Sequence, residues 1–224
     1  MRIEVLGELR LSTGPLRGRA AELLRLLVTG QGRPVAVHTI TEVLWGDHPP
    51  RSAGANLHTY ASRVRAVLDD DARLVHAGGG YRLLGGDRDL TSFVALAASG
   101  DPVCLREALV LWQGPPITAA MRERSVVAEG IACRFEELRL QAYARLAAAV
   151  EPASIVGELR QLVAEHPRRE SVHALLVRAL YEAGDAAAAL LEYHRLRRAL
   201  ADELGVEPSA PLRALYRSVL RNAA

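Results

Sequence analysis

The hydrophobic pattern of the chain changes at residue 87, and this change limits the folds that the sequence can adopt. Before residue 87, short alternating segments and glycine-rich turns are mixed with helical segments, whereas only helical periodicity follows it. The chain has 224 residues, enough for one large domain or two smaller ones with separate cores. The pattern therefore predicts two parts, residues 1–86 with small β-sheets and residues 87–224 made of helices.

The order of elements in the first part narrows the fold further. Strands, two helices, a loop, a third helix and a glycine-rich hairpin are the order of a winged helix-turn-helix. The third helix then takes the recognition position, and the hairpin takes the position of the wing. We expect Thr39 to be the N-cap of the second helix. The expected elements are strands within 2–11, helices over 18–29, 38–45 and about 53–68, and a hairpin over 73–84.

The second part has the sequence pattern of a helical repeat. A turn at Gly184-Asp185 is followed by a small residue, Ala189, and an aromatic one, Tyr193, as in the second half of a tetratricopeptide repeat. The fold class is therefore mainly α, with a winged helix-turn-helix followed by an all-α tetratricopeptide-like domain. Helices are expected over 91–98, 103–112, 122–149, 153–165, 170–183, 186–203 and 209–222.

The third helix, written NLHTYASRVRAVL from residue 56, has an unusual polar face. Four apolar residues share one side at helical spacing, namely Leu57, Ala61, Val64 and Leu68. The opposite side carries Asn56, Thr59, Ser62 and Arg63, and no acidic residue occurs between residues 56 and 68. A helix in the major groove needs hydrogen-bond donors aimed at base edges and no negative charge near phosphates. The pattern therefore favours DNA recognition over an ordinary solvated surface.

Charge and composition are consistent with this interpretation without establishing it. All 28 basic residues are arginine, and the net charge is +2. Residues 1–86 hold 11 arginines and 8 acidic residues, so the basic surplus lies in the part with the unusual helix. No signal-peptide pattern and no apolar run of roughly 20 residues is present, so we expect a cytoplasmic protein that does not enter a membrane.

No other group of residues in the sequence has the spacing of a catalytic or metal-binding site. Cys104 and Cys133 lack metal or disulfide spacing and are expected to be buried in a reducing cytosol. His166 and His173 have no third ligand nearby, and the acidic pairs have the pattern of solvated faces. We therefore expect no metal, no cofactor and no enzymatic activity.

Two long segments resemble a known family. LWGDHPPRSAGANLHTYASRVRAVL with GGGYRL resembles the DNA-binding domain of OmpR-type response regulators, in the version found in the Streptomyces antibiotic regulatory proteins. The block from EHPRRE to ADELGVEPS resembles the bacterial transcriptional activation domain that follows it there. The resemblance covers about residues 3–221. It implies a transcriptional activator, often pathway-specific for secondary metabolism, that binds direct repeats near the −35 element. It also implies RNA polymerase holoenzyme, including its sigma factor, as a partner, and a homodimer on double-stranded DNA.

The helix face and the resemblance together assign roles to residues. Base edges are expected to be read by Arg63 first, then Asn56, Thr59 and Ser62. The DNA backbone is expected to be contacted by Trp45, Arg51, His58, Tyr60, Arg65, Arg73 and Arg82. The resemblance further implies that Asp47, His48, Pro49 and Pro50 form a loop that meets RNA polymerase. In the wing, His76-Ala77 stands where relatives carry a basic residue for the minor groove, so a strong contact there is not expected.

Two other functions also fit the sequence. The chain could be an adaptor whose helical repeat binds a peptide or protein, with a weakened winged helix, or a regulator gated by a small molecule held in the helical array. Trp45 could equally be a core anchor, and the loop at 47–50 could be only a connector. The weak wing favours the adaptor, whereas the acid-free helix face favours the DNA-binding activator.

Overall fold

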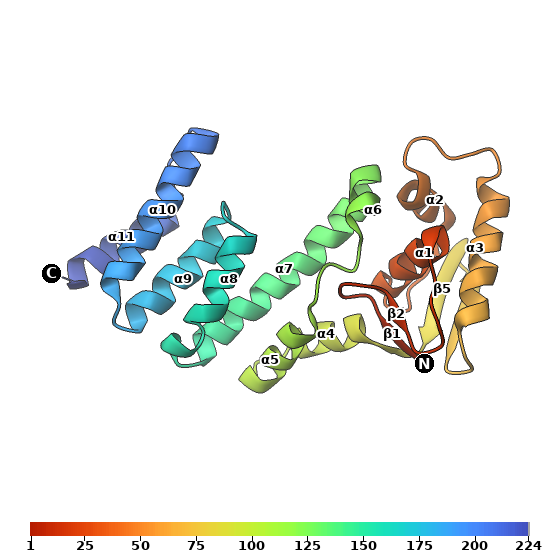
Figure 1. Cartoon of the computed structure of the whole chain (residues 1–224), viewed down its shortest axis with the longest axis horizontal. Coiled ribbons are helices and arrows are strands. Elements are labelled where there is room, and N and C mark those ends of the chain that lie inside the picture. Colours follow the sequence, from red (N-terminus) through yellow and green to blue (C-terminus); the bar gives the residue numbers. More distant parts are fainter. Residues whose placement is uncertain (224) are drawn as a thin grey trace. The chain divides into compact units, whose positions relative to one another are not determined.

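The computed structural model describes residues 1–223 and divides the chain into two compact units, one ending at Ala142 and the other beginning at Tyr143 (Figure 1). The first unit contains all the strands: β1 (Arg2–Glu4), β2 (Arg10–Leu11), β3 (Val35–Ala36), β4 (Ala72–Ala77), β5 (Gly80–Gly85) and β6 (Asp87–Arg88). Its helices are α1 (Gly18–Thr29), α2 (Val37–Trp45), α3 (Ala53–Val67), α4 (Asp89–Ala97), α5 (Pro102–Leu111) and α6 (Ala119–Arg124). Helix α7 (Val126–Ala149) continues into the second unit, which holds η1 (Pro152–Ser154), α8 (Val156–Glu165), α9 (Glu170–Glu182), α10 (Ala186–Leu204) and α11 (Ala210–Ala223).

Two small sheets frame the first unit. One has the strand order β2-β1-β6, with β2 antiparallel and β6 parallel to β1. The other has the order β3-β5-β4 and contains the predicted hairpin. Gly80 is required in this sheet because a Cβ there would lie 2.0 Å from the carbonyl oxygen of Val35. The β3 and β5 backbones can therefore pair at this point only around a glycine.

The core of the first unit centres on α1. Its residues Leu23, Leu24 and Leu27 are fully buried, and α1 packs against α2, α3 and β5. Arg25 is buried in this core, and its guanidinium donates to the carbonyl oxygens of Val5 at 2.9 Å, Gly7 at 2.6 Å and Pro116 at 3.0 Å. Because a buried guanidinium must have its donors satisfied, these bonds connect α1 to segments on both sides of residue 87.

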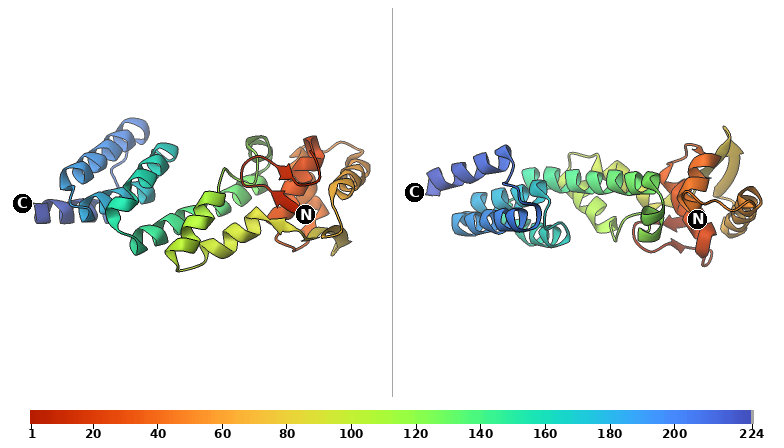
Figure 2. Two further views of the ribbon diagram at one scale, coloured as in Figure 1. Left: turned by 60° about the horizontal axis from the view of Figure 1, so that its bottom comes forward. Right: turned by 90° about the horizontal axis from the view of Figure 1, so that it is seen from above.

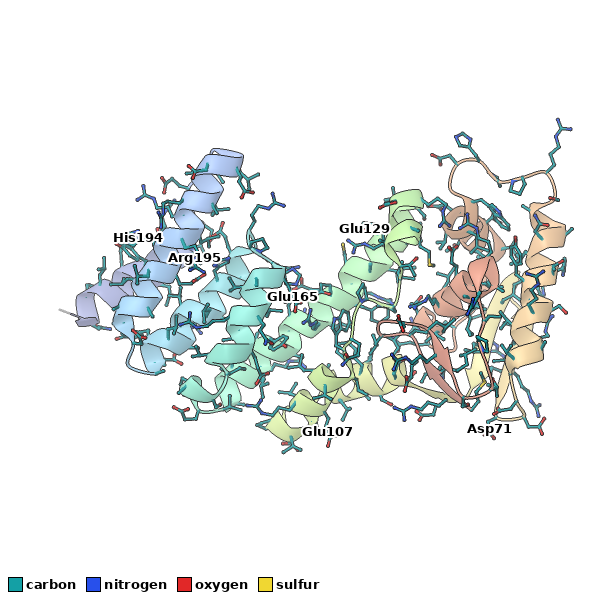
Figure 3. The ribbon with its side chains drawn as sticks, viewed as in Figure 1. Asp71, Glu107, Glu129, Glu165, His194 and Arg195 are labelled. Carbon is teal, nitrogen blue, oxygen red and sulfur yellow. The ribbon has the colours of Figure 1, made fainter. Side chains whose placement is uncertain are left out.

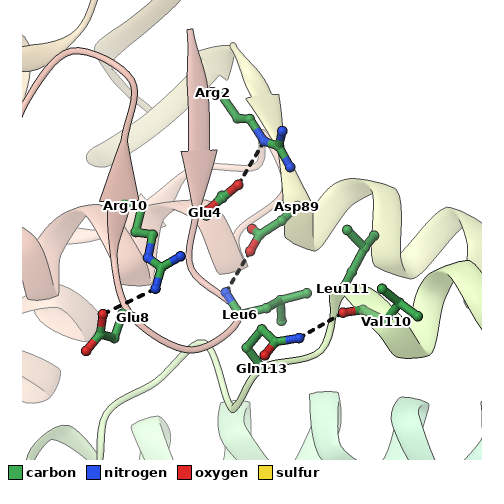
Figure 4. A pocket seen from close by; sticks show the side chains of 9 residues that line it. All are labelled: Arg2, Glu4, Leu6, Glu8, Arg10, Asp89, Val110, Leu111 and Gln113. Atoms are coloured by element: carbon green, nitrogen blue, oxygen red, sulfur yellow. Dashed lines mark hydrogen bonds and ion pairs between the residues drawn. The ribbon is translucent and has the colours of Figure 1, made fainter.

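Asp89 joins the start of α4 to the first strand. Its carboxylate accepts hydrogen bonds from the backbone N–H groups of Val5 (2.9 and 3.0 Å), Leu6 (2.8 Å) and Leu90 (2.7 Å). Burial raises the pKa of Asp89, and the three N–H donors oppose that rise. Figure 4 shows Asp89 facing the backbone of Leu6. The chain is thus held together at the point where the strands end and the helices begin.

The helices after residue 87 pack as neighbours in sequence. In the first unit α4 and α5 form a closely packed pair (Figure 2). In the second unit α8 packs on α9, α9 on α10, and α10 on α11. The turn at Gly184-Asp185 joins α9 to α10, and the Asp185 side chain caps α10 by accepting from the N–H of Ala188 at 2.9 Å. Ala189 is fully buried, and Tyr193 stacks on Tyr216 of α11 with ring centroids 4.1 Å apart. The small residue and the aromatic thus lie where the repeat pattern predicts them.

In the first part and directly after it, the elements agree with the sequence prediction except at three places. Thr39 is not the N-cap of α2, because β3 pairs with β5 and the helix begins directly after it with Ala36 at the cap position. Strand β3 was not predicted. Strand β6 lies at residues 87–88, where no strand was expected, and it forms because Arg2 pairs with Asp87. Both strands have only two residues, too few to show an alternating pattern.

The second part contains two further differences. The single helix expected over 122–149 is two helices, because the backbone of Ser125 is extended and its hydroxyl oxygen accepts from the N–H of Ala128 at 3.2 Å. The segment expected to start a helix at 153 begins as a short 3-10 turn before α8. The expectation of buried cysteines was wrong, since Cys104 is half-buried and Cys133 is exposed. Their thiols lie near the carboxylates of Asp101 (3.6 Å) and Glu129 (3.3 Å).

Candidate nucleic-acid interface

Helix α3 has one buried face and one exposed face, as the apolar spacing predicts. Leu57, Ala61 and Val64 are 3%, 0% and 0% exposed, and the helix packs on α1 and β4. Leu68 departs from the prediction because the helix ends at Val67 and the Leu68 backbone is extended, which leaves its side chain half-buried. The buried face fixes which way the polar face points, and that face is turned away from the core.

The polar face of α3 contains donors that the protein itself does not use. Arg63 and Ser62 are exposed, and within residues 1–223 the structure gives Arg63 no hydrogen bond and no ion pair. The Thr59 hydroxyl donates to the carbonyl oxygen of Ala55 at 3.1 Å. The Asn56 amide donates to the Ser52 hydroxyl at 3.2 Å, across the start of the helix. Arg63 therefore presents a cationic donor to any ligand at this face, while Asn56 and Thr59 retain acceptor capacity for one.

One edge of α3 is tied to the hairpin. The Nε of Arg65 donates to the carbonyl oxygen of Leu74 at 3.1 Å. The His58 ring lies on the same side, with its Nδ1 3.4 Å from the hydroxyl of Tyr81. The His76 ring meets Tyr81 edge-on, with ring centroids 5.1 Å apart. These contacts hold the hairpin against the helix, so Arg65 and His58 have structural partners in addition to their predicted role at the DNA backbone.

The other edge of α3 is tied to α2 by aromatic rings. Trp45, the last residue of α2, stacks on Tyr60 with ring centroids 6.1 Å apart and planes inclined by 28°. Both side chains are half-buried, so each has part of its surface on the outside of the unit. Trp45 thus acts as an anchor between two helices while part of its surface stays accessible at the predicted interface.

The hairpin does not bring Arg73 and Arg82 to the face that packs on α3. Directly opposed residues of an antiparallel pair point to the same side of the sheet. Leu74 and Leu83 are opposed and buried, whereas Arg73 opposes Leu84 and Arg82 opposes Val75 on the other side. The two arginines therefore share the face of the hairpin turned away from α3. The Nε atom of Arg82 is buried and has no hydrogen-bond partner among the described residues.

The loop between α2 and α3 is open to solvent. All residues from 47 to 51 are exposed, including the predicted polymerase-contacting residues Asp47, His48, Pro49 and Pro50 and the predicted backbone contact Arg51. Gly46 begins the loop with φ +65°, and a Cβ there would lie 2.7 Å from the carbonyl oxygen of Arg124. The loop is therefore fixed at its first residue and exposed beyond it.

The acidic run that follows α3 lies beyond the end of the helix. Figure 3 shows Asp71 at that end of the unit. The Met1 ammonium pairs with Asp71 at 2.9 Å and with Asp69 at 3.3 Å, and the hydrogen bond that it donates to Asp71 raises the pKa of that ammonium group. Part of the negative charge near the helix is thus offset, and α3 itself carries no acid.

Sequence reasoning missed a cluster behind this interface. Arg124 and Ser125, at the junction of α6 and α7, bond to residues of α1 and α2, and Glu22 and Glu42 are their partners. Arg124 and Glu22 are 102 positions apart. No local pattern marks such a pair, because salt-bridge partners distant in sequence leave no trace in periodicity.

A cleft of about 320 Å³ lies elsewhere on the first unit. Its walls include the ion pairs Arg2–Glu4, at 2.9 Å, and Arg10–Glu8, at 3.6 Å, together with the carboxylate of Asp89 (Figure 4). Since these charged groups already have partners within the protein, the cleft does not favour the small-molecule hypothesis. Among the described residues no cluster of three or more potential metal ligands is found, and none of the helices there could span a membrane.

Comparison with known proteins identifies the family. A model of the bacterial transcriptional activator domain matches residues 93–220. The transcriptional regulatory protein MoaR1 of Mycobacterium tuberculosis is 35% identical over 252 residues, covering 99% of this chain and 79% of MoaR1. The chain belongs to the Streptomyces antibiotic regulatory protein (SARP) family of transcriptional regulators. This membership places it among regulators rather than enzymes.

Other SARP relatives extend beyond the matched region. The regulatory protein AfsR of Streptomyces coelicolor is 37% identical over 246 residues, and the match spans 99% of this chain but 24% of AfsR. A solved structure of Mycobacterium tuberculosis EmbR in complex with a low-affinity phosphopeptide superposes with a TM-score of 0.80 at 31% identity. That match covers 99% of this chain and 65% of the EmbR chain. The chain thus spans about a quarter of AfsR and about two thirds of EmbR, and the EmbR likeness supports the winged-helix and helical architecture of the SARP fold.

Proposed function

We propose that the chain is a sequence-specific DNA-binding transcriptional activator. In this proposal residues 1–86 read promoter DNA and carry the loop that meets RNA polymerase, and residues 87–224 form the activation domain. It acts in the cytoplasm on chromosomal DNA, at promoters of a secondary-metabolite pathway. The observation that carries the proposal is the exposed face of α3, where Arg63 has no partner within residues 1–223 and no acidic residue occurs in the helix. Membership of the SARP family supports it.

We further propose that two copies bind a direct repeat near the −35 element. The tip of the hairpin carries His76 and Ala77 instead of a permanent cation, and Arg73 and Arg82 lie on the side away from α3. A single winged helix therefore has few groups to neutralise phosphates, and affinity for DNA depends strongly on the number of such contacts. A second copy on the neighbouring repeat doubles them.

The exposed loop supports RNA polymerase holoenzyme, including its sigma factor, as the protein partner. Residues 47–50 are exposed and adjoin the recognition helix, so a loop in this position can touch a polymerase subunit bound next to the same DNA. Two prolines restrict the loop backbone and lower the entropy lost when a partner binds. DNA reading and polymerase contact are thus assigned to neighbouring but different residues.

The DNA-binding part is tested by fluorescence anisotropy with a duplex that carries a direct repeat from a neighbouring promoter. We expect binding at least about a thousandfold tighter than to bulk DNA, the lower end for specific regulators. Affinity should also fall linearly with the logarithm of salt concentration, by a slope of about 0.9 per phosphate contacted. If no direct repeat is bound more tightly than bulk DNA, the chain is the helical-repeat adaptor instead.

The polymerase part needs a separate experiment. The double variant Asp47→Ala, His48→Ala is assayed by transcription in vitro with purified holoenzyme, with Arg178→Ala on the exposed side of α9 as control. We expect the loop variant to keep wild-type DNA affinity and to lose most of the activation, because the altered side chains lie off the α3 face. Full activation by the loop variant would remove the loop from the polymerase contact.

A further inference from the structure

Arg124 lies at the end of α6, directly against the C-terminal end of α2. Its guanidinium donates to the carbonyl oxygens of Leu44 at 2.8 Å and Val43 at 3.1 Å. It also pairs with the carboxylate of Glu22 in α1 at 3.1 and 3.3 Å. The Arg124 side chain is 21% exposed and that of Glu22 is 18% exposed. One cation from the activation part thus joins two helices of the winged helix.

The carbonyls that Arg124 meets are groups that a helix cannot satisfy by itself. The last four carbonyl oxygens of an α-helix have no partner within the helix, and they carry the negative end of its dipole. Helix α2 has no basic residue in its last turn. Arg124 supplies the missing cation from outside, and bonds between a charged donor and a carbonyl are stronger than neutral ones.

The end of α2 that Arg124 contacts also adjoins the predicted DNA-binding face. Trp45 follows Leu44 and stacks on Tyr60 of α3. Gly46 comes next, and its Cα faces the carbonyl oxygen of Arg124 so closely that no side chain fits between them. Ser125 adds a bond from its hydroxyl to the Glu42 carboxylate at 3.2 Å. The segment from 42 to 46 is therefore held from behind at several consecutive points.

We propose that Arg124 is a positioning residue for DNA binding. It holds the last turn of α2, and through it the Trp45 ring and the first residue of the α2–α3 loop, in the arrangement that α3 needs at the DNA. The inference rests on the DNA-binding function proposed above. It means that the winged helix of this chain depends on a residue that follows it by nearly forty positions. A binding site is effective only when the elements that carry it are held rigidly by surrounding contacts.

The test compares Arg124→Gln with a matched control in the same helix, Arg122→Gln. Arg122 also forms an ion pair, with Glu129 of α7, but that pair is solvent-exposed, and among the described residues Arg122 has no hydrogen bond or ion pair with α1 or α2. Both variants are made in a Trp112→Phe background, so that Trp45 is the only remaining tryptophan. Three quantities are measured: the Kd for the direct-repeat duplex, the thermal midpoint, and quenching of Trp45 fluorescence by acrylamide without DNA.

We expect Arg124→Gln to raise the Kd by about tenfold, a shift that corresponds to the loss of one charge-assisted contact. Its Trp45 should become more accessible to acrylamide, while Arg122→Gln should leave both the Kd and the quenching of Trp45 unchanged. Arg124→Lys keeps the charge but loses the forked geometry, so it should lie between wild type and Arg124→Gln. It also serves as the test variant if Arg124→Gln does not fold.

The outcomes separate the two proposals. If the wild type binds direct repeats and a folded Arg124→Gln binds them equally well, the positioning role is wrong while the DNA-binding function stands. If Trp45 quenching is unchanged although the Kd rises, Arg124 does not act through the α2 corner, and the inference also fails. If the wild type shows no specific DNA binding, the proposed function fails, and this inference fails with it.

Discussion

The exposed face of α3 and the interior of the α9–α10 pair treat polar side chains in opposite ways. On α3, Arg63 is exposed and has no partner among residues 1–223. Between α9 and α10, His173 is 2% exposed, and both of its ring nitrogens have acceptors: Glu192 at 2.7 Å and the carbonyl oxygen of Pro167 at 3.0 Å. Polar groups that stay exposed and unpaired remain available to a ligand, whereas buried and fully paired ones hold the fold.

The buried pair is surrounded by hydrogen-bond acceptors. The Glu192 carboxylate and the Pro167 carbonyl lie against the two ring nitrogens of His173. The hydrogen bond with His173 holds the pKa of Glu192 below its usual range, although burial opposes the shift. The pair also fixes the turn around Pro167, which precedes α9. A histidine that the sequence left without a role thus belongs to the architecture of the helical repeat.

The largest effect should come from breaking this buried pair. We expect His173→Leu to lower the free energy of unfolding by about 3 kcal/mol, because the buried carboxylate of Glu192 loses its hydrogen-bond partner and keeps only the longer ion pair with Arg195 at 3.8 Å. Urea unfolding followed by circular dichroism measures the loss. The double variant His173→Leu, Glu192→Leu should recover much of it, since replacing both partners removes the buried charge. A single variant as stable as wild type would show that the pair is not the architectural element described above.

Removing Arg63 should weaken DNA binding and leave the stability of the fold unchanged. We expect Arg63→Ala to weaken binding of the direct-repeat duplex by about 1–3 kcal/mol, the range for one bidentate contact to guanine. Its thermal midpoint should stay at the wild-type value, because Arg63 is exposed and has no hydrogen bond or ion pair within residues 1–223. Anisotropy titration gives the affinity for DNA and thermal melting gives the midpoint, with Arg178→Ala on α9 as the control. If Arg63→Ala lowers the thermal midpoint but keeps the affinity for DNA, Arg63 stabilises the fold and does not bind DNA.

Acid should weaken the buried pair and leave the α3 face unchanged. Because the pKa of Glu192 is lower in the folded state than in the unfolded chain, its contribution is present above the unfolded value of about 4.3 and is lost as pH falls through the folded value. Unfolding free energies measured by urea titration from pH 6 to pH 3 should therefore fall with decreasing pH. In Glu192→Gln this decline should be shallower, and an equally steep decline would assign it to other carboxylates.

The smallest effect is expected at Thr59. Its side chain is exposed and its hydroxyl bonds only to the carbonyl oxygen of Ala55 in the preceding turn. Thr59→Val keeps the shape and should change stability by less than about 0.5 kcal/mol. If Thr59 reads a base, discrimination at one position of the repeat should relax, which competition with point-substituted duplexes would detect. Equal competition by all duplexes would leave Thr59 outside base reading.

The same contrast explains what could be predicted from the sequence. Helix α3, its buried face and the glycine hairpin follow from local periodicity and turn residues, so they were predicted correctly. Strands β3 and β6 are too short for any period, and each exists only because a distant strand provides a partner. The helix break at Ser125 combines a local cap, the hydroxyl that accepts from the N–H of Ala128, with a bond to the distant Glu42 that the local sequence does not encode.

For the candidate site, too, the sequence predicted some features and missed others. The spacing of residues on α3 placed Arg63, Thr59 and Ser62 on its exposed side. The side of the hairpin occupied by Arg73 and Arg82 follows from the pairing register, which composition alone does not give. The bond from Arg65 to Leu74 and the contacts of Arg124 join segments that come together only after folding. Their functions in DNA binding remain predictions.

The close contact of Gly80 with Val35 has a consequence for how such a regulator can diversify. Gly80 pairs with Ala77 directly beside the turn of the hairpin, and it accepts no side chain. Gly78 and Gly79 form the turn with φ of +60° and +71°, which disfavours side chains there as well. Mutation is therefore restricted at these glycines but open at the exposed residue His76. A single change such as His76→Arg adds a permanent cation there in place of the edge-on contact between the His76 and Tyr81 rings. If the hairpin is the wing of a DNA-binding domain, as proposed above, regulators of this kind can acquire new promoter preferences at this position while the glycines keep the turn unchanged.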